Sequence, residues 1–305
     1  NIARGDGAVA TIMSTHNSLA CLPLVRYGTE QQKERFLKPL ARGEHIGAIS
    51  ITESQSGSNA ADIRTTAVKS GNGYVLNGVK QLVTSGSDAD TVMMLACTDP
   101  DSGPRGITCF IVPKATPGFR VGRIEEKLGI RASGTAELIL ENVEVPDANV
   151  LGDVGGGYRI ALASLGTSRI GISAQAVGLA QAALDAAVAY AKERESFGKP
   201  IIEHQAVAFR LADMAAQIEA ARQSTLHATC LADAGLPHHN ESSMAKLVAA
   251  EMAERVCSDA IQTLGGAGYL ADHPVERLYR DARICQIYEG TSDILRMIIS
   301  RELMR

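Results

Sequence analysis

Four short segments of the sequence combine hydroxyl, charged and glycine residues within otherwise apolar surroundings. They are residues 51–59, 82–86, 194–200 and 280–292. The hydroxyl and glycine residues of the first segment offer backbone N–H groups and side-chain donors to an anion or to the edge of a cofactor. In the third segment, Arg194 and Lys199 could pair with phosphates. Taken singly, each segment is also explained by an ordinary loop, strand end or turn.

The last of these segments contains the carboxylate of greatest interest. Glu289 precedes Gly290 and the hydroxyl residues Thr291 and Ser292, one of which could cap a following helix. A carboxylate in this position is either part of the helix cap or a base held in place to accept a proton. The pattern alone leaves both interpretations open.

The overall composition excludes several kinds of partner. The 305 residues are 45% hydrophobic and 21% charged, which is ordinary for a soluble, well-packed protein of about two domains. The 30 basic and 34 acidic residues give a net charge of −4. Because there is neither a basic field nor a polybasic segment, we expect no nucleic acid and no anionic membrane as partners.

The six cysteines are far apart, with no Cys-x-x-Cys motif and no histidine at metal-ligand spacing. We therefore expect buried or half-buried free thiols in a reducing compartment, and no metal site. No run of 18 apolar residues is free of polar interruption, so no transmembrane helix is predicted. The sequence starts without Met, already within a helical pattern. We expect that the true N-terminus is absent from this sequence, so that a targeting sequence, if there is one, is not visible.

Within the first 150 residues, the pattern changes near residue 46 from one typical of helices to one typical of short strands. Residues 8–24 and 30–40 are predicted helices, with Thr29 as the cap of the second and Gly43 at its end. From residue 46 to about 150, short β-rich runs are separated by turn residues, which is typical of a sandwich or barrel. Within them, Asn77-Gly78 between residues 74–76 and 79–84 predicts a β-hairpin.

After residue 150 the sequence predicts long helices. They cover residues 158–195, a stretch through 207–221, and then 241–264, 274–282 and 292–304. Val207, Leu211, Met214, Ile218 and Ala221 form one apolar stripe, and Gly265-Gly266 is a typical helix end. The order of helices, β domain and antiparallel helix bundle excludes a doubly wound nucleotide-binding fold, and no Gly-x-Gly-x-x-Gly motif follows a strand.

Together, these segments resemble the acyl-CoA dehydrogenase family over essentially the whole chain. Residues 51–58 resemble the first signature of that family. Residues 262–266, 280–283 and 287–292 resemble the second, and residues 194–198 with His204 and Gln205 also match. Several independent motifs in the family's order make a chance agreement negligible.

The resemblance implies an α+β fold with three parts. They are a truncated N-terminal helical domain (1–45), a central β-sandwich or barrel-like domain (46–150) and a C-terminal antiparallel four-helix bundle (151–305). It also implies FAD, a homotetramer built as a dimer of dimers, and an electron-transferring flavoprotein as partner. The implied activity is dehydrogenation of an acyl-CoA thioester to 2-enoyl-CoA, in fatty acid β-oxidation.

The resemblance also implies roles for individual residues, with Glu289 as the catalytic base and Thr84 near the reactive edge of the flavin. Arg194, Ser196, Gln262 and Gly266 would reach the FAD of a neighbouring subunit. The substrate contacts implied are Ser58, Ser168, Arg169 and Gly290. The full set of implied cofactor contacts is Ile49, Ile51, Thr52, Ser58, Leu82, Val83, Thr84, Arg194, Ser196, Phe197, His204, Gln205, Gln262, Gly265, Gly266, Tyr288, Thr291 and Asp293.

The chemistry fits the role implied for Glu289. An apolar pocket would raise the pKa of a carboxylate toward neutrality, which suits a base that removes a weakly acidic α-proton. The Glu289 backbone N–H and the flavin ribityl chain would stabilise enolate-like charge on the thioester oxygen. Some family members carry the base near the position of Ser168, but residues 165–169 hold no carboxylate.

Three residues depart from the family pattern. Asn59 and Gly166 stand where the family often has Asp, and Leu82 replaces a common Trp beside the flavin. Residues 8–20 contain no Arg, which argues against a dicarboxylyl substrate.

The rival interpretations are a flavin oxidase or monooxygenase of the same fold, a non-catalytic relative, and a di-metal bundle protein. The last needs Glu-x-x-His pairs, which the sequence lacks. The implied location is the cytoplasm of a bacterium or the mitochondrial matrix of a eukaryote.

Overall fold

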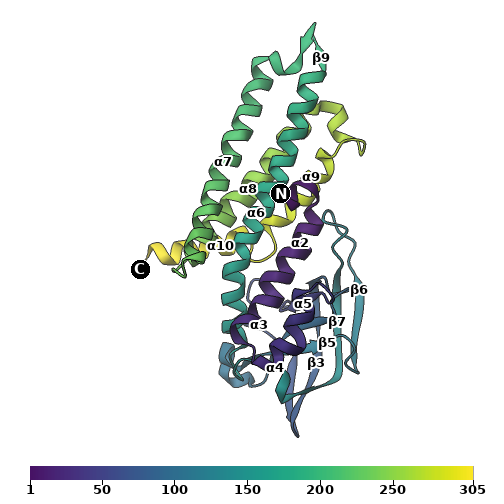
Figure 1. Cartoon of the computed structure of the whole chain (residues 1–305), viewed down its shortest axis with the longest axis vertical. Helices are drawn as coiled ribbons and strands as arrows, with labels where there is room; N and C mark the ends of the chain where they lie inside the picture. The colour runs from purple at the N-terminus through teal and green to yellow at the C-terminus, as the bar shows by residue number, and fades with distance from the viewer. Residues whose placement is uncertain (305) are drawn as a thin grey trace. The chain divides into compact units, whose positions relative to one another are not determined.

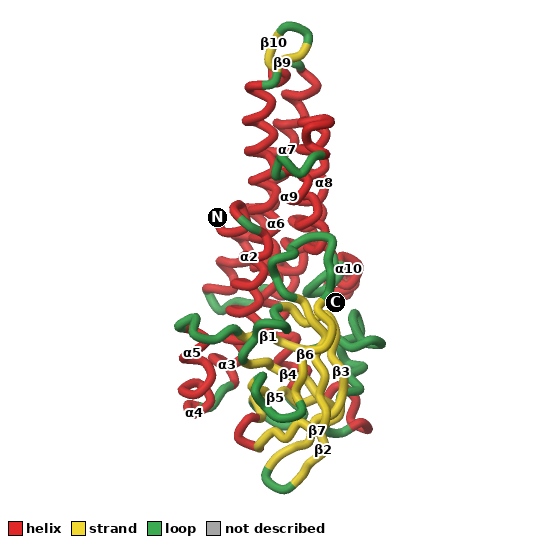
Figure 2. Tube along the Cα trace, turned by 90° about the vertical axis from the view of Figure 1, so that its right-hand side faces the viewer, coloured by secondary structure: helices red, strands yellow, loops and turns green. Residues whose placement is uncertain are grey.

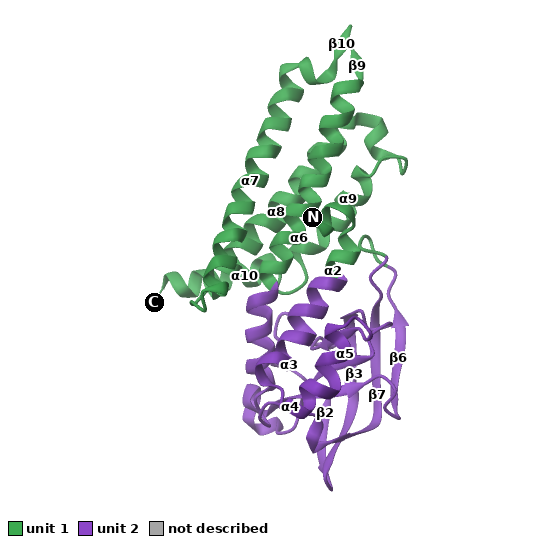
Figure 3. Ribbon diagram, in the orientation of Figure 1, with its two compact units in different colours: residues 1–11, 127–131, 169–305 green, residues 12–126, 132–168 purple. Residues whose placement is uncertain are grey.

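The computed structural model describes residues 1–304, which form N-terminal helices, a central β-sheet and C-terminal helices (Figure 1). This order confirms the predicted fold class. The chain divides into two compact units (Figure 3). Unit 1 contains residues 1–11, 127–131 and those from 169 onward, and unit 2 contains residues 12–126 and 132–168. The units divide the chain at other positions than residues 45 and 150, so the three domain boundaries stay a prediction.

The predicted N-terminal helices are present, and wider π-helical turns interrupt them. The segments are α1 (Ile2–Gly5), α2 (Gly7–Thr15), η1 (His16–Cys21), α3 (Leu22–Tyr27), α4 (Glu30–Gln32), η2 (Lys33–Leu37) and α5 (Lys38–Ala41). Gly43, with a φ of +72°, follows the last of them, as the sequence predicted.

Thr29 caps α4 through a capping box, as predicted. Its hydroxyl accepts a hydrogen bond from Gln32 N at 3.2 Å, and Gln32 Oε1 accepts one from Thr29 N at 3.0 Å. Gln32 Nε2 also donates to the carbonyls of Ala148 and Val150, at 2.9 and 2.7 Å. The box therefore fixes both the start of this helix and its attachment to the end of the sheet.

Substituting Thr29 with Ala is expected to destabilise the protein by about 1 kcal/mol, because Gln32 N loses its acceptor. Calorimetry should show a midpoint lowered by about 2–4 °C. Ser300→Ala removes an exposed hydroxyl that bonds only the backbone of its own helix, so it serves as the control. An unchanged midpoint for Thr29→Ala would show that the box contributes nothing.

Eight strands form one mixed sheet in unit 2. They are β1 (Gly47–Ser50), β2 (Thr66–Ser70), β3 (Gly73–Thr84), β4 (Thr91–Cys97), β5 (Ile107–Pro113), β6 (Phe119–Ile124), β7 (Thr135–Pro146) and β8 (Val150–Leu151). Their order is β6-β7-β3-β2-β4-β5-β8, and β1 pairs with β4 in parallel. Most other pairs are antiparallel, which agrees with the predicted series of short strands.

Strand β4 is covered on both faces. Met93 and Leu95 join a core that includes Leu24 and Phe36 of the N-terminal helices. The alternate residues Val92, Met94 and Ala96 join a second core with side chains of β3, β5 and β7. Because successive side chains of a strand point to opposite faces, one strand supplies both cores.

The hairpin predicted at Asn77-Gly78 is wrong. Strand β3 continues through this dipeptide, where its pairing with β7 shifts register. Asn77 Oδ1 accepts a hydrogen bond from Asn142 N at 2.8 Å, and a Cβ on Gly78 would lie 2.5 Å from the Thr65 hydroxyl. The dipeptide therefore lies opposite a β-bulge formed by residues 141–142 of β7, with close backbone approach at Gly78. The tight turn lies at residues 71–72, between the paired residues Ser70 and Gly73.

The C-terminal helices, drawn as red tubes in Figure 2, pack around a core of small and apolar residues in unit 1. They are α6 (Gly157–Glu193), which begins in unit 2, α7 (Gln205–Asp233), α8 (His239–Leu264), α9 (Val275–Ala282) and α10 (Ser292–Leu303). Four members of the predicted stripe on α7 are buried, and Val207 is partly buried. Helix α8 ends at Gly265, whose φ is +64°, as predicted.

Two helical stretches are long and apolar enough to cross a membrane by length and composition alone: residues 7–27 and 157–193. One or two such helices are weak evidence of a membrane span, so the absence of a transmembrane helix stays a prediction. Burial gives a different reason for their composition, because 44% and 61% of the apolar 18-residue window in each stretch lies inside the folded protein. Ala-rich helices in a tightly packed core have the same composition.

Candidate active site

Glu289 lies in a strained turn between η7 (Arg283–Gln286) and α10, in unit 1. Its φ is +54°, an uncommon value for a residue with a side chain, and Gly290 follows with a φ of +100°. The Thr291 hydroxyl then caps α10 by accepting a hydrogen bond from Ile294 N at 3.2 Å. Of the two hydroxyl residues that the sequence suggested as the cap, the structure therefore uses Thr291.

Two buried cations accompany this carboxylate. Both Glu289 carboxylate oxygens are shielded from solvent, and the carboxylate interacts electrostatically with Arg169 of α6 and Lys246 of α8. Burial lowers the pKa of Lys246 to about 8, against the opposing charges of Cys285 and Glu289. Burial also lowers the pKa of Arg169, against the charge of Glu289. The surroundings are therefore more charged than the apolar pocket that the sequence predicted.

Hydrogen bonds hold the residues on either side of Glu289. The Tyr288 hydroxyl donates to Gln175 Oε1 at 2.6 Å, and Gln175 Nε2 donates to the Thr11 hydroxyl at 2.9 Å. On the other side, Lys246 Nζ donates to the carbonyl of Gly290 at 2.6 Å. The turn is thus attached to α2, α6 and α8. Strained backbone of this kind persists only where the surroundings over-determine it.

The other predicted residues of unit 1 form two further groups. Arg194, Ser196, Phe197, His204 and Gln205 belong to the hairpin of β9 (Glu195–Ser196) and β10 (Lys199–Pro200) and to the start of α7. Phe197 is 95% exposed at the tip, and its ring meets the His204 ring edge-on at 6.0 Å. Gln262, Gly265 and Gly266 form the second group, exposed at the end of α8. Figure 1 shows this hairpin at one end of the bundle, away from α10.

The predicted residues of unit 2 gather at two neighbouring segments. Ile49 lies on β1, and Ile51, Thr52 and Ser58 lie on or after its end, whereas Leu82, Val83 and Thr84 end β3. Gln81 N donates to the Thr52 carbonyl at 2.8 Å, which joins the two segments. Leu82 is 60% exposed with a φ of +55°, whereas the Val83 side chain is buried in the sheet core. Any ligand contact of Val83 would therefore come from its backbone.

Two remaining predicted residues have side chains in different settings. Ser168 is buried, and its hydroxyl donates to the Leu165 carbonyl of the same helix at 3.1 Å. Asp293 is exposed in the first turn of α10, near Arg296. Neither is brought to Glu289 by a described hydrogen bond, so their roles stay predictions.

The sequence did not reveal a buried ion pair that includes Glu53 of the 51–59 segment. Lys80 Nζ contacts Glu53 Oε1 at 2.8 Å, and both side chains are almost fully buried. Glu53 also accepts hydrogen bonds from the backbone N–H groups of Arg64 and Thr65 and from Gln55 Nε2. Burial along β3 does not alternate regularly, so the sequence contains no signal of the inward position of Lys80.

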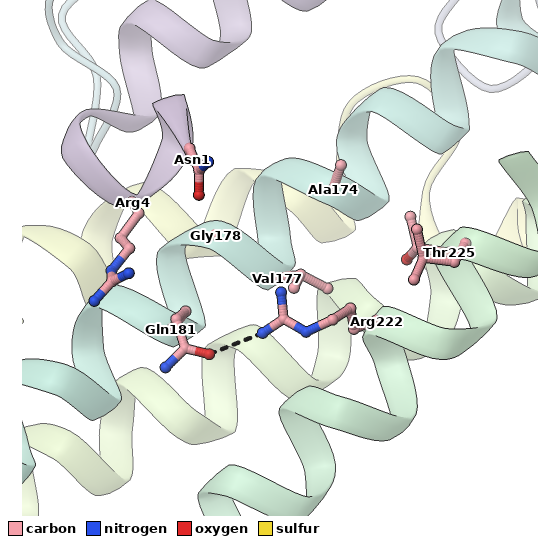
Figure 4. A pocket seen from close by; sticks show the side chains of 9 residues that line it. Asn1, Arg4, Ala174, Val177, Gly178, Gln181, Arg222 and Thr225 are labelled. Atoms are coloured by element: carbon pink, nitrogen blue, oxygen red, sulfur yellow. Dashed lines mark hydrogen bonds between the residues drawn. The ribbon is translucent and has the colours of Figure 1, made fainter.

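The cavity shown in Figure 4 contains none of the predicted site residues. It has a volume of about 310 Å³ and is lined by residues of the N-terminus, α6 and α7 within unit 1. Arg4 pairs with Asp185 at 2.6 Å, and Arg222 pairs with Glu219 at 3.0 Å and bonds Gln181. The charged side chains Arg4 and Arg222 already have protein partners, and the cavity is separate from the Glu289 turn.

Among residues 1–304, no group of three or more His, Cys, Asp or Glu side chains is arranged to hold a metal ion.

Three family models cover almost the whole chain. The acyl-CoA dehydrogenase N-terminal domain matches residues 1–44, the middle domain residues 48–143 and the C-terminal domain residues 155–304. The chain belongs to the acyl-CoA dehydrogenase family. It is therefore an oxidoreductase, which confirms the resemblance found in the sequence.

Known members of the family agree with this assignment. The mitochondrial short-chain specific acyl-CoA dehydrogenase of Rattus norvegicus is 46% identical, over 100% of this chain and 74% of its own. Butyryl-CoA dehydrogenase from Megasphaera elsdenii is 44% identical with a TM-score of 0.98, over 99% of this chain and 79% of its own. A chain in a structure of the electron transferring flavoprotein of Acidaminococcus fermentans is 46% identical with a TM-score of 0.98, over 99% of this chain and 80% of its own.

Members of the acyl-CoA dehydrogenase family are FAD flavoproteins, which confirms the predicted cofactor. The donor set of unit 2 fits such a group. Hydroxyls on Thr52, Ser58 and Thr84 accompany the exposed apolar side chain of Leu82. A planar ring with a polar edge requires this combination of donors and apolar contact.

Proposed function

We propose that this protein dehydrogenates a short-chain acyl-CoA thioester to its 2-enoyl form, with Glu289 as the base. The supporting observation is the Glu289 turn itself. It is strained, it is attached to three helices, and its carboxylate oxygens are shielded from water beside two buried cations. Nearby cations favour the ionised form of a carboxylate, and a base must be ionised to accept a proton.

The proposed roles divide the reaction between two carbons of the acyl chain. Glu289 takes the proton from the α-carbon through a carboxylate oxygen. Its backbone N–H donates to the thioester oxygen and stabilises the enolate-like charge that develops there. FAD, when bound, supplies the acceptor for the hydride that leaves the β-carbon. Loss of the proton and the hydride leaves the α,β double bond of the product.

The remaining predicted contacts belong to the same proposal. Arg169 and Gly290 lie beside the base, where they would face the thioester, and Ser58 would contact the CoA portion. The Ser168 side chain is committed to its own helix, so its contribution would be to packing. A short acyl chain is supported by the relatives named short-chain specific and by the butyryl-CoA enzyme.

We further propose that electrons pass to an electron-transferring flavoprotein, and that the protein acts as a homotetramer. The first is supported by the similar chain in the electron transferring flavoprotein structure. The exposed hairpin supports the second, because a ring that is 95% exposed at a strained tip is suited to contact with another subunit. Arg194, Ser196 and Gln262 would then reach the FAD of that subunit.

Anaerobic titration of the FAD-loaded protein with acyl-CoA thioesters tests this function. We expect butyryl-CoA to bleach the visible flavin absorption, with weaker bleaching by octanoyl-CoA and none by glutaryl-CoA. A protein that cannot be loaded with FAD, or that no thioester bleaches, would refute the proposal. Rapid recovery of colour in oxygen with formation of hydrogen peroxide would instead favour the same-fold oxidase.

A further inference from the structure

Lys246 is a fully buried cation that none of the predicted roles uses. It lies on α8, where its neighbours on the buried face are the small residues Ser242, Ser243, Ala245, Ala249 and Ala250. Burial of an ammonium group is strongly unfavourable unless hydrogen bonds and opposite charge compensate it. An apolar residue in this position would avoid that cost, so the retained charge calls for an explanation.

The ammonium group is directed at the turn that carries the proposed base. Lys246 Nζ donates to the Gly290 carbonyl at 2.6 Å, and its charge interacts with Glu289. The Gly290 carbonyl belongs to the second of two successive residues with positive φ. Its orientation therefore fixes the end of the turn, just as the bond from Tyr288 to Gln175 fixes the beginning.

We propose that Lys246 is a positioning residue that holds the Glu289–Gly290 turn in the geometry required for α-proton removal. This inference rests on the proposed function, in which Glu289 is the base. Lys246 touches the backbone of the turn and acts on the reaction through Glu289. Loss of its hydrogen bond removes the bond from α8 to the Gly290 carbonyl, whereas the bond from Tyr288 to Gln175 and the cap of α10 remain.

The variant that tests this role is Lys246→Met, which keeps much of the side-chain volume and removes the donor and the charge. In the FAD-loaded protein with butyryl-CoA, we expect kcat to fall about 10- to 100-fold, as for a small misplacement of a reacting group. KM should change little, because Lys246 does not touch the substrate. Met252→Ala is the matched control, since it removes a buried apolar side chain from the same helix, six residues after Lys246. It should lower the unfolding temperature and leave kcat near the wild-type value.

Hydrogen–deuterium exchange gives a readout that does not depend on turnover. The amides of residues 287–292 should exchange faster in Lys246→Met than in wild type, and at the wild-type rate in Met252→Ala. If Lys246→Met folds poorly, Lys246→Ala supplies the second test. Added ethylammonium should restore part of kcat and of the amide protection, whereas tetramethylammonium, which has no N–H donor, should restore neither.

The possible results separate the two proposals. A wild-type protein that no thioester bleaches, with the exchange effect present, would refute the function and its catalytic consequence but retain the attachment of the turn. A Lys246→Met variant with wild-type kcat and wild-type exchange would overturn the positioning role while the function stands. Equal losses of kcat in Lys246→Met and Met252→Ala would overturn it as well, because they would reflect general destabilisation of α8.

Discussion

Turnover is expected to fall by about 10³-fold when Glu289 is replaced with Gln, within the range that a general base contributes. The amide has nearly the same shape but cannot accept the α-proton at either of its terminal atoms. Because Gln lacks the negative charge, Arg169 and Lys246 also lose their shared counter-ion. The unfolding temperature should therefore fall as well, whereas FAD, which is proposed to be held mainly by other residues, should remain bound.

Two measurements separate the loss of the base from the loss of stability. Stopped-flow reduction with butyryl-CoA reports the chemical step, and uptake of deuterium at the α-carbon of the thioester from D₂O reports proton removal alone. Both should be almost absent in Glu289→Gln. Glu276→Gln makes the same chemical change in an ion pair with Arg280 on α9, so it should leave both measurements unaltered. Retained deuterium uptake in Glu289→Gln would place the base elsewhere.

The second large effect is expected at the buried pair of Glu53 and Lys80. Replacing Glu53 with Ala leaves the Lys80 ammonium buried without its partner, which should lower the free energy of unfolding by about 3–5 kcal/mol. The double variant Glu53→Gln with Lys80→Met removes both charges and should recover much of that loss. Urea denaturation of the single and double variants measures the difference. A Glu53→Ala protein of wild-type stability would show that the pair is energetically neutral.

The same pair predicts a dependence of stability on pH. Burial raises the pKa of Glu53, but the charge of Lys80 and the hydrogen bonds from Lys80, Thr65 and Gln55 outweigh burial and lower it to about 2, from 4.5. A carboxyl whose pKa is depressed by folding stabilises the folded state above its unfolded pKa. That contribution should disappear as the pH falls from about 4.5 towards 2. Glu53→Gln should remove this part of the acid unfolding curve.

Lys80 acts in the opposite direction at alkaline pH. Burial lowers its pKa to about 8, from 10.5, although the charge of Glu53 opposes the shift. The folded state therefore disfavours the protonated amine, and the resulting destabilisation is present below about pH 8 and vanishes above about 10.5. The lowered pKa of Glu53 is the better supported of the two shifts, since the Glu53 carboxylate accepts four hydrogen bonds.

The elements that the sequence predicted well are those whose signals are local. The stripe on α7 follows from the helical period, and Thr29, Gly265 and Thr291 mark helix ends by their own side chains or their lack of one. The dipeptide Asn77-Gly78 carried an equally local signal and misled, because in the folded chain it lies inside the long strand β3, opposite a β-bulge of β7. Only the pairing of β3 with β7 distinguishes the two outcomes.

The surroundings of Glu289 could not be predicted, because they depend on residues distant in the chain. The network of Tyr288 includes Gln175 and Thr11, which are 113 and 277 residues away. Lys246 and Lys80 are charged residues in buried positions, and composition places such residues at the surface. The family motifs identified the base itself, whereas the charges and bonds that hold it appear only in the folded chain.

The apolar pattern of strand β4 does not by itself fix its hydrogen-bonding register with the neighbouring strands. With apolar side chains on both faces, a shift by one residue would place Met93 and Leu95 in the core of Val92 and Met94, without exposing a hydrophobic side chain. The polarity of the strand thus gives little protection against slippage. Asp90, at its start, supplies the missing constraint: its carboxylate accepts from Ile46 N at 2.8 Å, its N–H donates to the Ile46 carbonyl at 2.8 Å, and its carbonyl accepts from Lys114 N at 2.9 Å. One polar residue at the margin of the sheet thereby decides which side chains enter which core.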